Sequence, residues 1–178
     1  MTRIRRFSGL AALVISGVAL ICGSAASAAS GQGQARVKVG TAVRVVKTAD
    51  LDFGDFAAGT TTTRFILNAA TNTLTKQGGG NALPIGGTPA AASFTASGLP
   101  LLRVRITVNN AAITLVRNGG TETMRVDRLR LDGGNGTRNR FLNALGNVTY
   151  KVGGRLTIGA AQRDGAYRGT FGVTIDYQ

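Results

Sequence analysis

The sequence predicts an all-β fold, a β-sandwich, and three observations lead to this prediction. Apolar and polar residues alternate with period two in several runs; in residues 102–108, for example, apolar side chains alternate with Arg103, Arg105 and Thr107. Dipeptides of Gly with Asn or Asp separate these runs, and no segment after residue 28 has the spacing of a long amphipathic helix. Because successive side chains of a strand point to opposite faces of a sheet, each run offers one apolar face to a core.

The first 28 residues predict a secretory signal peptide. Three arginines among the first six residues precede an apolar run from Leu10 to Cys22, and Ala26 and Ala28 flank a serine in the small-residue pattern of a cleavage site. A run of about 13 residues is too short for a membrane span, which takes about 20. A retained membrane anchor and lipid attachment at Cys22 remain as alternatives, although Ile21 is not the small residue that precedes a lipidated cysteine.

Cleavage after Ala28 would leave residues 29–178, a length that suits one domain. We expect residues 29–46 to form an N-terminal extension or a first strand, and residues 47–178 to form the β-sandwich domain. The only cysteine, Cys22, is removed with the signal peptide. A mature chain without cysteine has no disulfide, so its hydrophobic core has to stabilise it. We expect an exported protein that passes through the periplasm to the cell surface or the medium, with no transmembrane segment after signal removal.

The chain is strongly basic, with 21 lysine and arginine residues against 8 acidic ones. Export removes three of the arginines and leaves a net charge of about +10, which favours acidic partners such as an anionic surface polymer. The basic residues are spread along the alternating runs, and the chain has no Trp. Because single-stranded nucleic acids bind to aromatic stacking platforms, we expect no nucleic-acid partner and interpret most of the charge as the solvated faces of strands.

Alternating runs predict strands along the mature chain. Between Met124 and Leu131 the parity of the apolar residues changes, which predicts a β-bulge near Asp127 and Arg128, because an extra residue exchanges the two faces. The apolar positions of the other clearest runs are Val37, Val39, Val43 and Val45; Val148, Tyr150, Val152, Leu156 and Ile158; and Tyr167, Phe171, Val173, Ile175 and Tyr177.

About eight short strands joined by tight turns favour an immunoglobulin-like β-sandwich, with a jelly roll as the alternative. The turns are predicted at Asn–Gly and Asp–Gly dipeptides, whose residues tolerate the positive φ of hairpin turns. Only the stretch from Arg140 to Gly146 is expected to form a short helical turn.

The sequence offers no conventional catalytic centre. His is absent and the mature part has no Cys, so Ser-His-Asp and Cys-His relays and histidine-dependent zinc sites are excluded. Asp50, Asp52 and Asp55 form one close acidic group, of the kind that a calcium ion or a glycosidase uses. Two of them alternate with apolar Leu51 and Phe53, which also fits an acidic strand edge. We expect no enzyme activity, no metal site and no cofactor.

The C-terminal sequence resembles the last strand of chaperone–usher pilins. In those proteins a glycine lies fourteen residues from the C-terminus, apolar residues alternate after it, and an aromatic residue stands at or beside the end. Here Gly165 and Tyr177 occupy the first and last of these positions. The resemblance implies that the strand borders a hydrophobic groove and is contacted by a chaperone, through Gly165, Tyr167, Phe171, Val173, Ile175 and Tyr177.

A second motif lies near the start of the expected sandwich. Leu51-Asp52-Phe53-Gly54, followed by Gly59, is similar to the LxFG…G element of spore-coat-protein-U-like, or archaic, chaperone–usher pilins. It is also similar to that of a widespread bacterial domain family of unknown function that shares both signatures, whose middle element fits residues 94–98. The resemblance covers about residues 35–178. Archaic pilins usually carry a disulfide, which the mature chain lacks, so their cysteine-free relatives are the better match.

In a pilin-like sandwich one strand is missing, and the N-terminal extension of the next subunit completes the sheet. The resemblance therefore implies a structural subunit of a surface fibre, a fimbrium used in cell adhesion, that assembles by donor-strand complementation. Its implied partners are like subunits, a periplasmic chaperone and an usher. The donor candidates are Val37, Val39, Val43 and Val45, because backbone hydrogen bonds and alternating side chains would fix their register.

Two other interpretations of the same residues remain open. Residues 37–45 also fit the first strand of a self-contained domain, because both arrangements require the same alternation. The protein also fits a periplasmic or surface binding module for an acidic polymer, which would use the arginine-bearing faces of its strands.

Overall fold

The structure is a computed structural model that describes residues 40, 42–109 and 111–178. The described residues belong to one compact unit with thirteen strands, and none of them is helical. The all-β prediction is confirmed. The predicted signal peptide with Ala26 and Ala28, and the donor candidates Val37 and Val39, lie outside the described residues.

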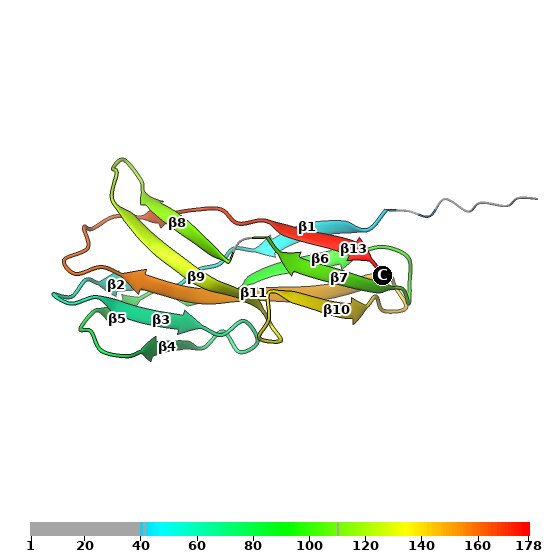
Figure 1. The fold of residues 1–178 in the computed structure, drawn as a ribbon, viewed down its shortest axis with the longest axis horizontal. Coiled ribbons are helices and arrows are strands. Elements are labelled where there is room, and N and C mark those ends of the chain that lie inside the picture. Colours follow the sequence, from blue (N-terminus) through cyan, green and yellow to red (C-terminus); the bar gives the residue numbers. More distant parts are fainter. Residues whose placement is uncertain (1–39, 41, 110) are drawn as a thin grey trace, which may run out of the picture. The chain divides into compact units, whose positions relative to one another are not determined.

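The strands follow one another along the chain as labelled in Figure 1. They are β1 (Arg44–Ala49), β2 (Asp55–Ala57), β3 (Thr63–Leu67), β4 (Leu74–Gln77), β5 (Leu83–Gly86), β6 (Ala92–Ser97), β7 (Arg103–Val108), β8 (Ala112–Arg117), β9 (Thr123–Leu131), β10 (Thr137–Phe141), β11 (Asn147–Ile158), β12 (Tyr167–Arg168) and β13 (Val173–Tyr177).

Eight strands form a large antiparallel sheet with the order β1-β6-β11-β9-β8-β12, in which β3 also pairs with β11 and β4 with β3. The longest strand, β11, changes partner along its length: Asn147–Val152 pairs with β6, whereas Gly154–Ile158 pairs with β3. Its other edge pairs with β9 between Val152 and Thr157. The large sheet is therefore built around β11.

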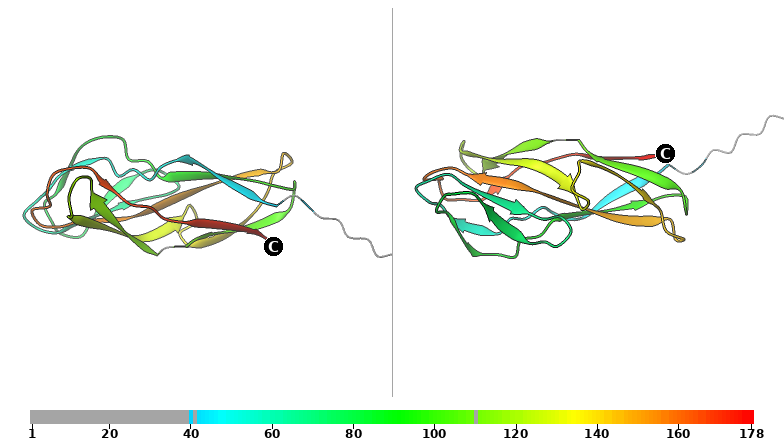
Figure 2. Two further views of the ribbon diagram at one scale, coloured as in Figure 1. Left: turned by 90° about the horizontal axis from the view of Figure 1, so that it is seen from above. Right: turned by 60° about the horizontal axis from the view of Figure 1, so that its bottom comes forward.

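A smaller antiparallel sheet consists of β10, β7 and β13, with β7 in the middle, and β2 and β5 form a separate pair. Side chains of β7 lie in one buried cluster with side chains of β6, β9 and β11. The two sheets are therefore the layers of a β-sandwich, which the views in Figure 2 show from two sides. The predicted fold class is confirmed.

The core consists of the apolar faces that the alternation predicts. In β7, Val104 and Ile106 are fully buried, whereas Arg103 and Arg105 are exposed. Tyr150 of β11 is the largest fully buried side chain, and burial raises the pKa of its hydroxyl. Other large core side chains are Phe65, Leu67, Phe94, Val126, Leu129, Leu131, Leu142, Val152, Leu156 and Ile158.

The predicted β-bulge lies in β9. Between Asp127 and Arg130, two residues of β9, Arg128 and Leu129, stand opposite a single residue of β11. Arg128 has a φ of 50°, in the left-handed region that favours glycine. The extra residue brings Leu129 into the same core as Val126, although the two positions differ in parity.

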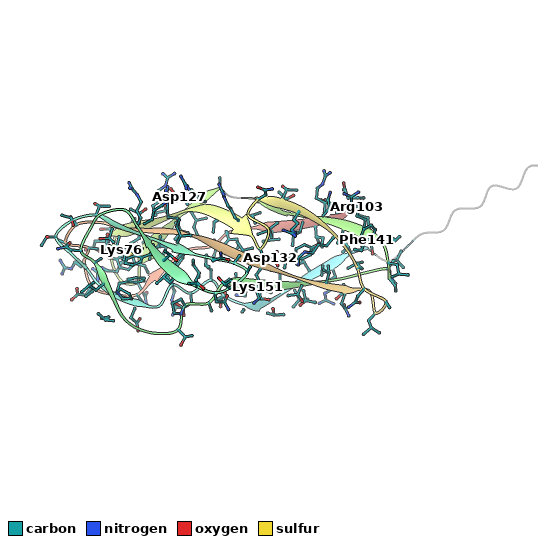
Figure 3. All side chains as sticks on the ribbon, turned by 90° about the horizontal axis from the view of Figure 1, so that it is seen from below. Lys76, Arg103, Asp127, Asp132, Phe141 and Lys151 are labelled. Atoms are coloured by element: carbon teal, nitrogen blue, oxygen red, sulfur yellow. The ribbon has the colours of Figure 1, made fainter. Side chains whose placement is uncertain are left out.

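A two-point ion pair joins β9 to β11 beside this bulge. Arg155 donates from Nε to Oδ1 of Asp127 and from Nη2 to Oδ2, each over 2.7 Å. Both side chains are more than four-fifths buried. The hydrogen bonds from Arg155 hold the pKa of the Asp127 carboxyl below its usual range. Figure 3 labels Asp127 in β9 and Asp132 just after the end of that strand.

The structure differs from the sequence-based expectations in two places. The described residues form more strands than the eight expected, partly because the run 167–177 is divided: β12 pairs with β8 of the large sheet, and β13 pairs with β7 of the small one. The chain crosses between the sheets at residues 169–172. The helical turn expected between Arg140 and Gly146 is wrong, because this stretch is the end of β10 followed by a non-helical turn.

Replacement of Arg128 by glycine is expected to stabilise the domain. Glycine adopts a φ of 50° without the steric penalty that arginine has, so the free energy of unfolding should rise by about 0.5–1 kcal/mol. Arg130→Gly is the matched control, since Arg130 lies in the same strand outside the left-handed region, and it should destabilise the domain. Urea unfolding of both variants measures the difference, and a loss of stability in Arg128→Gly would contradict the prediction.

The ion pair between Asp127 and Arg155 should make stability depend on pH. Because the pKa of Asp127 is lowered in the folded state, the contribution of the pair is present above the unfolded pKa of about 3.9 and is lost as the pH falls through the folded pKa. Asp127→Asn should cost about 1–3 kcal/mol at neutral pH. Urea unfolding between about pH 7 and pH 2 should show this difference shrinking below about pH 4.

Asp176→Asn controls for the loss of one negative charge, since Asp176 is exposed and makes no ion pair within the described part of the chain. A difference between Asp127→Asn and the wild type that stays constant over the whole pH range would show that the charge of Asp127 is not what stabilises the fold.

Candidate functional site: the seam between the first and last strands

The last strand, β13, lies at the edge of the small sheet, and among the described strands it pairs with β7 alone. The amide of Gln178 donates to the carbonyl of Arg103, and the amide of Asn109 donates to the carbonyl of Gly172. The even-numbered residues of β13 therefore direct their backbone N–H and C=O groups to β7. Because backbone groups alternate in direction along a strand, Val173 and Ile175 direct their N–H and C=O groups to the open side.

The first strand, β1, lies at the edge of the large sheet and pairs with β6. β1 and β13 lie close to each other, but among the described residues no strand pairing joins them. We call this pair of neighbouring edges the seam. In Figure 1, β1 is the cyan strand and β13 the red one. Within residues 42–109 and 111–178, the sandwich is therefore open along the edges formed by its first and last strands.

The apolar side chains along the seam are only half-buried, unlike those in the middle of the sandwich. Val104 and Ile106 of β7 are completely buried, whereas their cross-strand partners Tyr177 and Ile175 retain exposed surface. All the seam side chains pack against the core on their inner sides; they are Val43, Val45, Phe171, Val173, Ile175 and Tyr177. The seam therefore presents an incompletely covered apolar surface beside two strand edges that no further described strand joins.

Two aromatic contacts fix the position of the last strand. Phe171 meets Phe94 of β6 edge to face, with 5.9 Å between the ring centroids. The hydroxyl of Tyr177 accepts a hydrogen bond of 2.8 Å from the backbone N–H of Leu99. Gly98 makes room for it, because a Cβ at this position would lie 2.2 Å from the Tyr177 hydroxyl. The penultimate tyrosine thus anchors β13 to the turn after β6.

The chain enters β1 at the same end of the domain where β13 finishes. Arg44 stands opposite Ser97, and Gln178 bonds to Arg103. Residues 98–102 connect these two partners directly, so the start of β1 and the end of β13 are neighbours. β1 runs away from this end and β13 runs towards it, so that the two edges of the seam are antiparallel.

The structure places the other predicted donor candidates within the sandwich. Val45 lies in β1, opposite Ala96 of β6, and Val43 packs against the core just before the strand begins. The first strand therefore starts at Arg44, ahead of the expected boundary between residues 46 and 47. Of the predicted plug residues, Val37 and Val39 lie outside the described residues.

The motif near residue 51 has a structural role. Leu51 packs against the core, Phe53 is buried in it, and Gly54 has a φ of 82°, which a glycine adopts without strain. The N–H of Gly54 donates to the carboxylate of Asp52. The carbonyl of Gly59 accepts a bond of 2.7 Å from the amide of Ala161. The motif therefore shapes the connection from β1 to β3.

Gly165 and Tyr167 belong to the edge of the large sheet and not to the seam. Gly165 lies against the side chain of Arg117, and Tyr167 pairs with Arg117 across β8 and β12. Arg117 forms an ion pair of 2.6 Å with Glu122, whose pKa the hydrogen bond lowers to about 2. The predicted C-terminal set is thus divided between two places, and only Phe171, Val173, Ile175 and Tyr177 face the seam.

The acidic group does not come together as a metal site. Asp50 forms an ion pair with Lys47, and Asp52 accepts the Gly54 amide. No cluster of three or more metal-ligating side chains occurs within residues 40, 42–109 and 111–178. In the same part of the chain, no helix is long and apolar enough to cross a membrane.

A protein-family model, Domain of unknown function (DUF4402), matches residues 43–177. The chain belongs to this family. No curated protein and no solved structure matches the chain. The DUF4402 domain begins one residue before β1 and ends at the last residue of β13, so the family match coincides with the observed sandwich. Membership of a domain family of unknown function is confirmed, and the resemblance to pilins stays a prediction.

Sequence reasoning did not find Gly98 and Leu99 as neighbours of the last strand. The alternation of residues 92–97 predicts a strand but carries no signal for the hydroxyl contact between Tyr177 and Leu99, which are 78 residues apart. Only the small residue at position 98, next to the end of a strand, hints at a close approach.

Loss of the Tyr177 hydroxyl is expected to loosen the end of β13. Tyr177→Phe leaves the N–H of Leu99 without its acceptor, so the free energy of unfolding should fall by about 0.5–1.5 kcal/mol. Gln178→Ala is the control, because the exposed side chain of Gln178 donates to the carbonyl of the adjacent residue, and its effect should stay within about 0.5 kcal/mol. Equal stability of Tyr177→Phe and the wild type in urea unfolding would contradict this role.

Proposed function

We propose that the mature protein is an exported structural subunit of a surface fibre, in which the N-terminal segment of one copy completes the sandwich of the next. The observation that carries this proposal is the seam: within the described part of the chain, no strand pairs with the outer backbone groups of Val173 and Ile175, and the inward apolar side chains of β13 are only half-buried. An added strand would supply backbone hydrogen bonds to Val173 and Ile175 and cover the apolar surface at the same time.

The segment before β1 has suitable length and pattern for this role. Residues 29–42 would reach about 45 Å when extended, which exceeds the roughly 17 Å of a five-residue strand such as β13. Val37 and Val39 alternate with Arg36 and Lys38, so one face is apolar and the other charged. Two buried valines contribute about 3–6 kcal/mol before the cost of ordering the segment. A shift by one residue would bury the basic side chains instead, which fixes the register.

The direction of the chain favours a strand from another copy. The segment joins β1 at the end where β13 finishes, so if it folded back into its own seam it would run parallel to β13. A segment from a neighbouring copy is free to enter antiparallel to β13, which is the slightly more stable pairing. This difference in pairing stability favours a strand from another copy over the chain's own N-terminal segment.

In this proposal the open seam has to be covered before assembly, because exposed edge strands cause aggregation. A periplasmic chaperone that lends a strand, followed by an usher that exchanges it for the next subunit, would meet this need. The route runs through the periplasm to the cell surface, in agreement with the signal peptide that the first 28 residues predict.

Disulfide trapping tests the proposal directly, because the mature chain is free of cysteine. One mature chain carries Val39→Cys, or Val37→Cys for the neighbouring register, and a second chain carries Ile175→Cys. When the two are mixed and oxidised, a covalent heterodimer is expected. A single chain that carries both substitutions should form a ladder of covalent multimers on a non-reducing gel. A purely intramolecular disulfide in that chain would establish the self-contained domain instead.

Two controls make the result specific. Val116→Cys replaces Ile175→Cys in a matched mixture, since Val116 is exposed on β8, away from the seam, and should give little heterodimer. A chain without residues 29–42 should stay folded and monomeric and should bind a peptide of residues 29–43. A truncated chain that fails to bind this peptide would count against an open seam.

A further inference from the structure

A pocket of about 370 Å³ lies where β3, β9 and β11 meet, and none of the residues that line it comes from β1 or β13. Its walls include the turn after β3 on one side and the bulged part of β9 with the following turn on the other. We call it the arginine pocket, after the three arginines that line it: Arg128, Arg130 and Arg155.

The side chains that line the arginine pocket have a positive net charge. Asp132 is the one acidic residue among those that line it, and its carboxylate is paired with Arg140 at 2.8 Å. Arg155 is held by Asp127. Arg128 and Arg130 are exposed, and neither has a carboxylate within 4.0 Å in the described part of the chain. Two guanidinium groups thus remain available to an anion, and both also line a neighbouring hollow that contains Arg125.

The backbone at Arg128 supplies a second, independent observation. The bulge requires an extra residue with a φ of 50°, a conformation that glycine adopts most easily. Packing of the core does not require arginine there, because the side chain of Arg128 is exposed while Leu129 fills the core. A strained residue with an exposed functional group is typical of a site where that group has a use. The bulge places this group at the pocket.

We propose that the arginine pocket binds the carboxylate of an acidic sugar unit in an anionic polysaccharide. The planar guanidinium of arginine bonds a carboxylate through two parallel N–H groups, which gives both strength and orientation. The pocket volume lies in the range of small-ligand sites. Asn68 accepts backbone bonds from Ala70 and Thr71 through Oδ1, so its amide nitrogen is left to donate to a sugar hydroxyl.

The residues that line the pocket favour an acidic sugar over a nucleic acid or a membrane surface. No aromatic residue lines the pocket, so there is no platform on which a nucleobase would stack. The remaining walls are small or aliphatic, with two glycine pairs and Ile66, Leu67, Ala69 and Ala70. A concave site of this kind encloses one acidic unit, whereas a membrane surface would require a broad, flat basic face. The proposal does not depend on fibre assembly.

Calorimetric titration of the mature protein with hexagalacturonate tests the proposal, with maltohexaose as the neutral sugar of the same length. We expect saturable binding of hexagalacturonate that weakens when NaCl is raised from about 50 to about 300 mM, and no binding of maltohexaose. The pocket variant combines Arg128→Gly with Arg130→Ser and should bind about tenfold more weakly or worse. Its urea unfolding curve establishes that it is folded.

The matched control combines Arg103→Ser with Arg105→Ser, which removes the same charge from exposed positions of β7 in the small sheet. This control should change the affinity less than about twofold. An equal loss in both double variants would show that overall charge alone attracts the sugar and would overturn the proposal. Absence of saturable binding by the wild type, or tighter binding of a single-stranded oligonucleotide or of anionic vesicles, would overturn it as well.

Discussion

The pairing of β11 with three other strands is the constraint on which the rest of the structure depends. The strand pairs with β6 and then β3 along one edge and with β9 along the other, so it joins most of the large sheet. Its fully buried residues, including Tyr150 and Val152, form the centre of the core. The bulge in β9 opposite β11 also places Arg128 at the arginine pocket, because the extra residue directs Arg128 outward while Val126 and Leu129 stay in the core.

Residues 43–177 contain no cysteine, and the part of the sandwich that the structure describes is open at the seam. The stability of the domain therefore depends mainly on the burial of apolar side chains. This burial is incomplete at the seam, where Val173 and Ile175 are only half-buried. An unpaired edge beside an uncovered apolar face is unfavourable for an isolated soluble protein. Natural sheets usually protect such edges, and this contrast is the reason for proposing that a strand is added at the seam.

The arginines of this chain have different structural roles, which a count of charged residues does not separate. Arg155, Arg140 and Arg117 are parts of ion pairs that connect neighbouring segments. Arg103 and Arg105 occupy the exposed face of β7, as the solvated-face interpretation predicts. Surface charge of this second kind gives solubility and weak, screened attraction to acidic polymers. Binding of a defined acidic group requires guanidinium groups that converge on a cavity, and only the three-dimensional arrangement brings these together.

The sequence by itself determined which face of each strand is buried. Side chains of a strand alternate in direction with a period of two residues, which is a local property of the chain. This period predicts the burial of Val104 and Ile106, the exposure of Arg103 and Arg105, and the bulge at Arg128. The tertiary structure alone decided which strand edges pair. It separated Tyr167 from Ile175 into different sheets, placed Val45 beside Ala96 and brought the Tyr177 hydroxyl to Leu99. These contacts join residues far apart in the chain, and alternation specifies the direction of a side chain without specifying its neighbour.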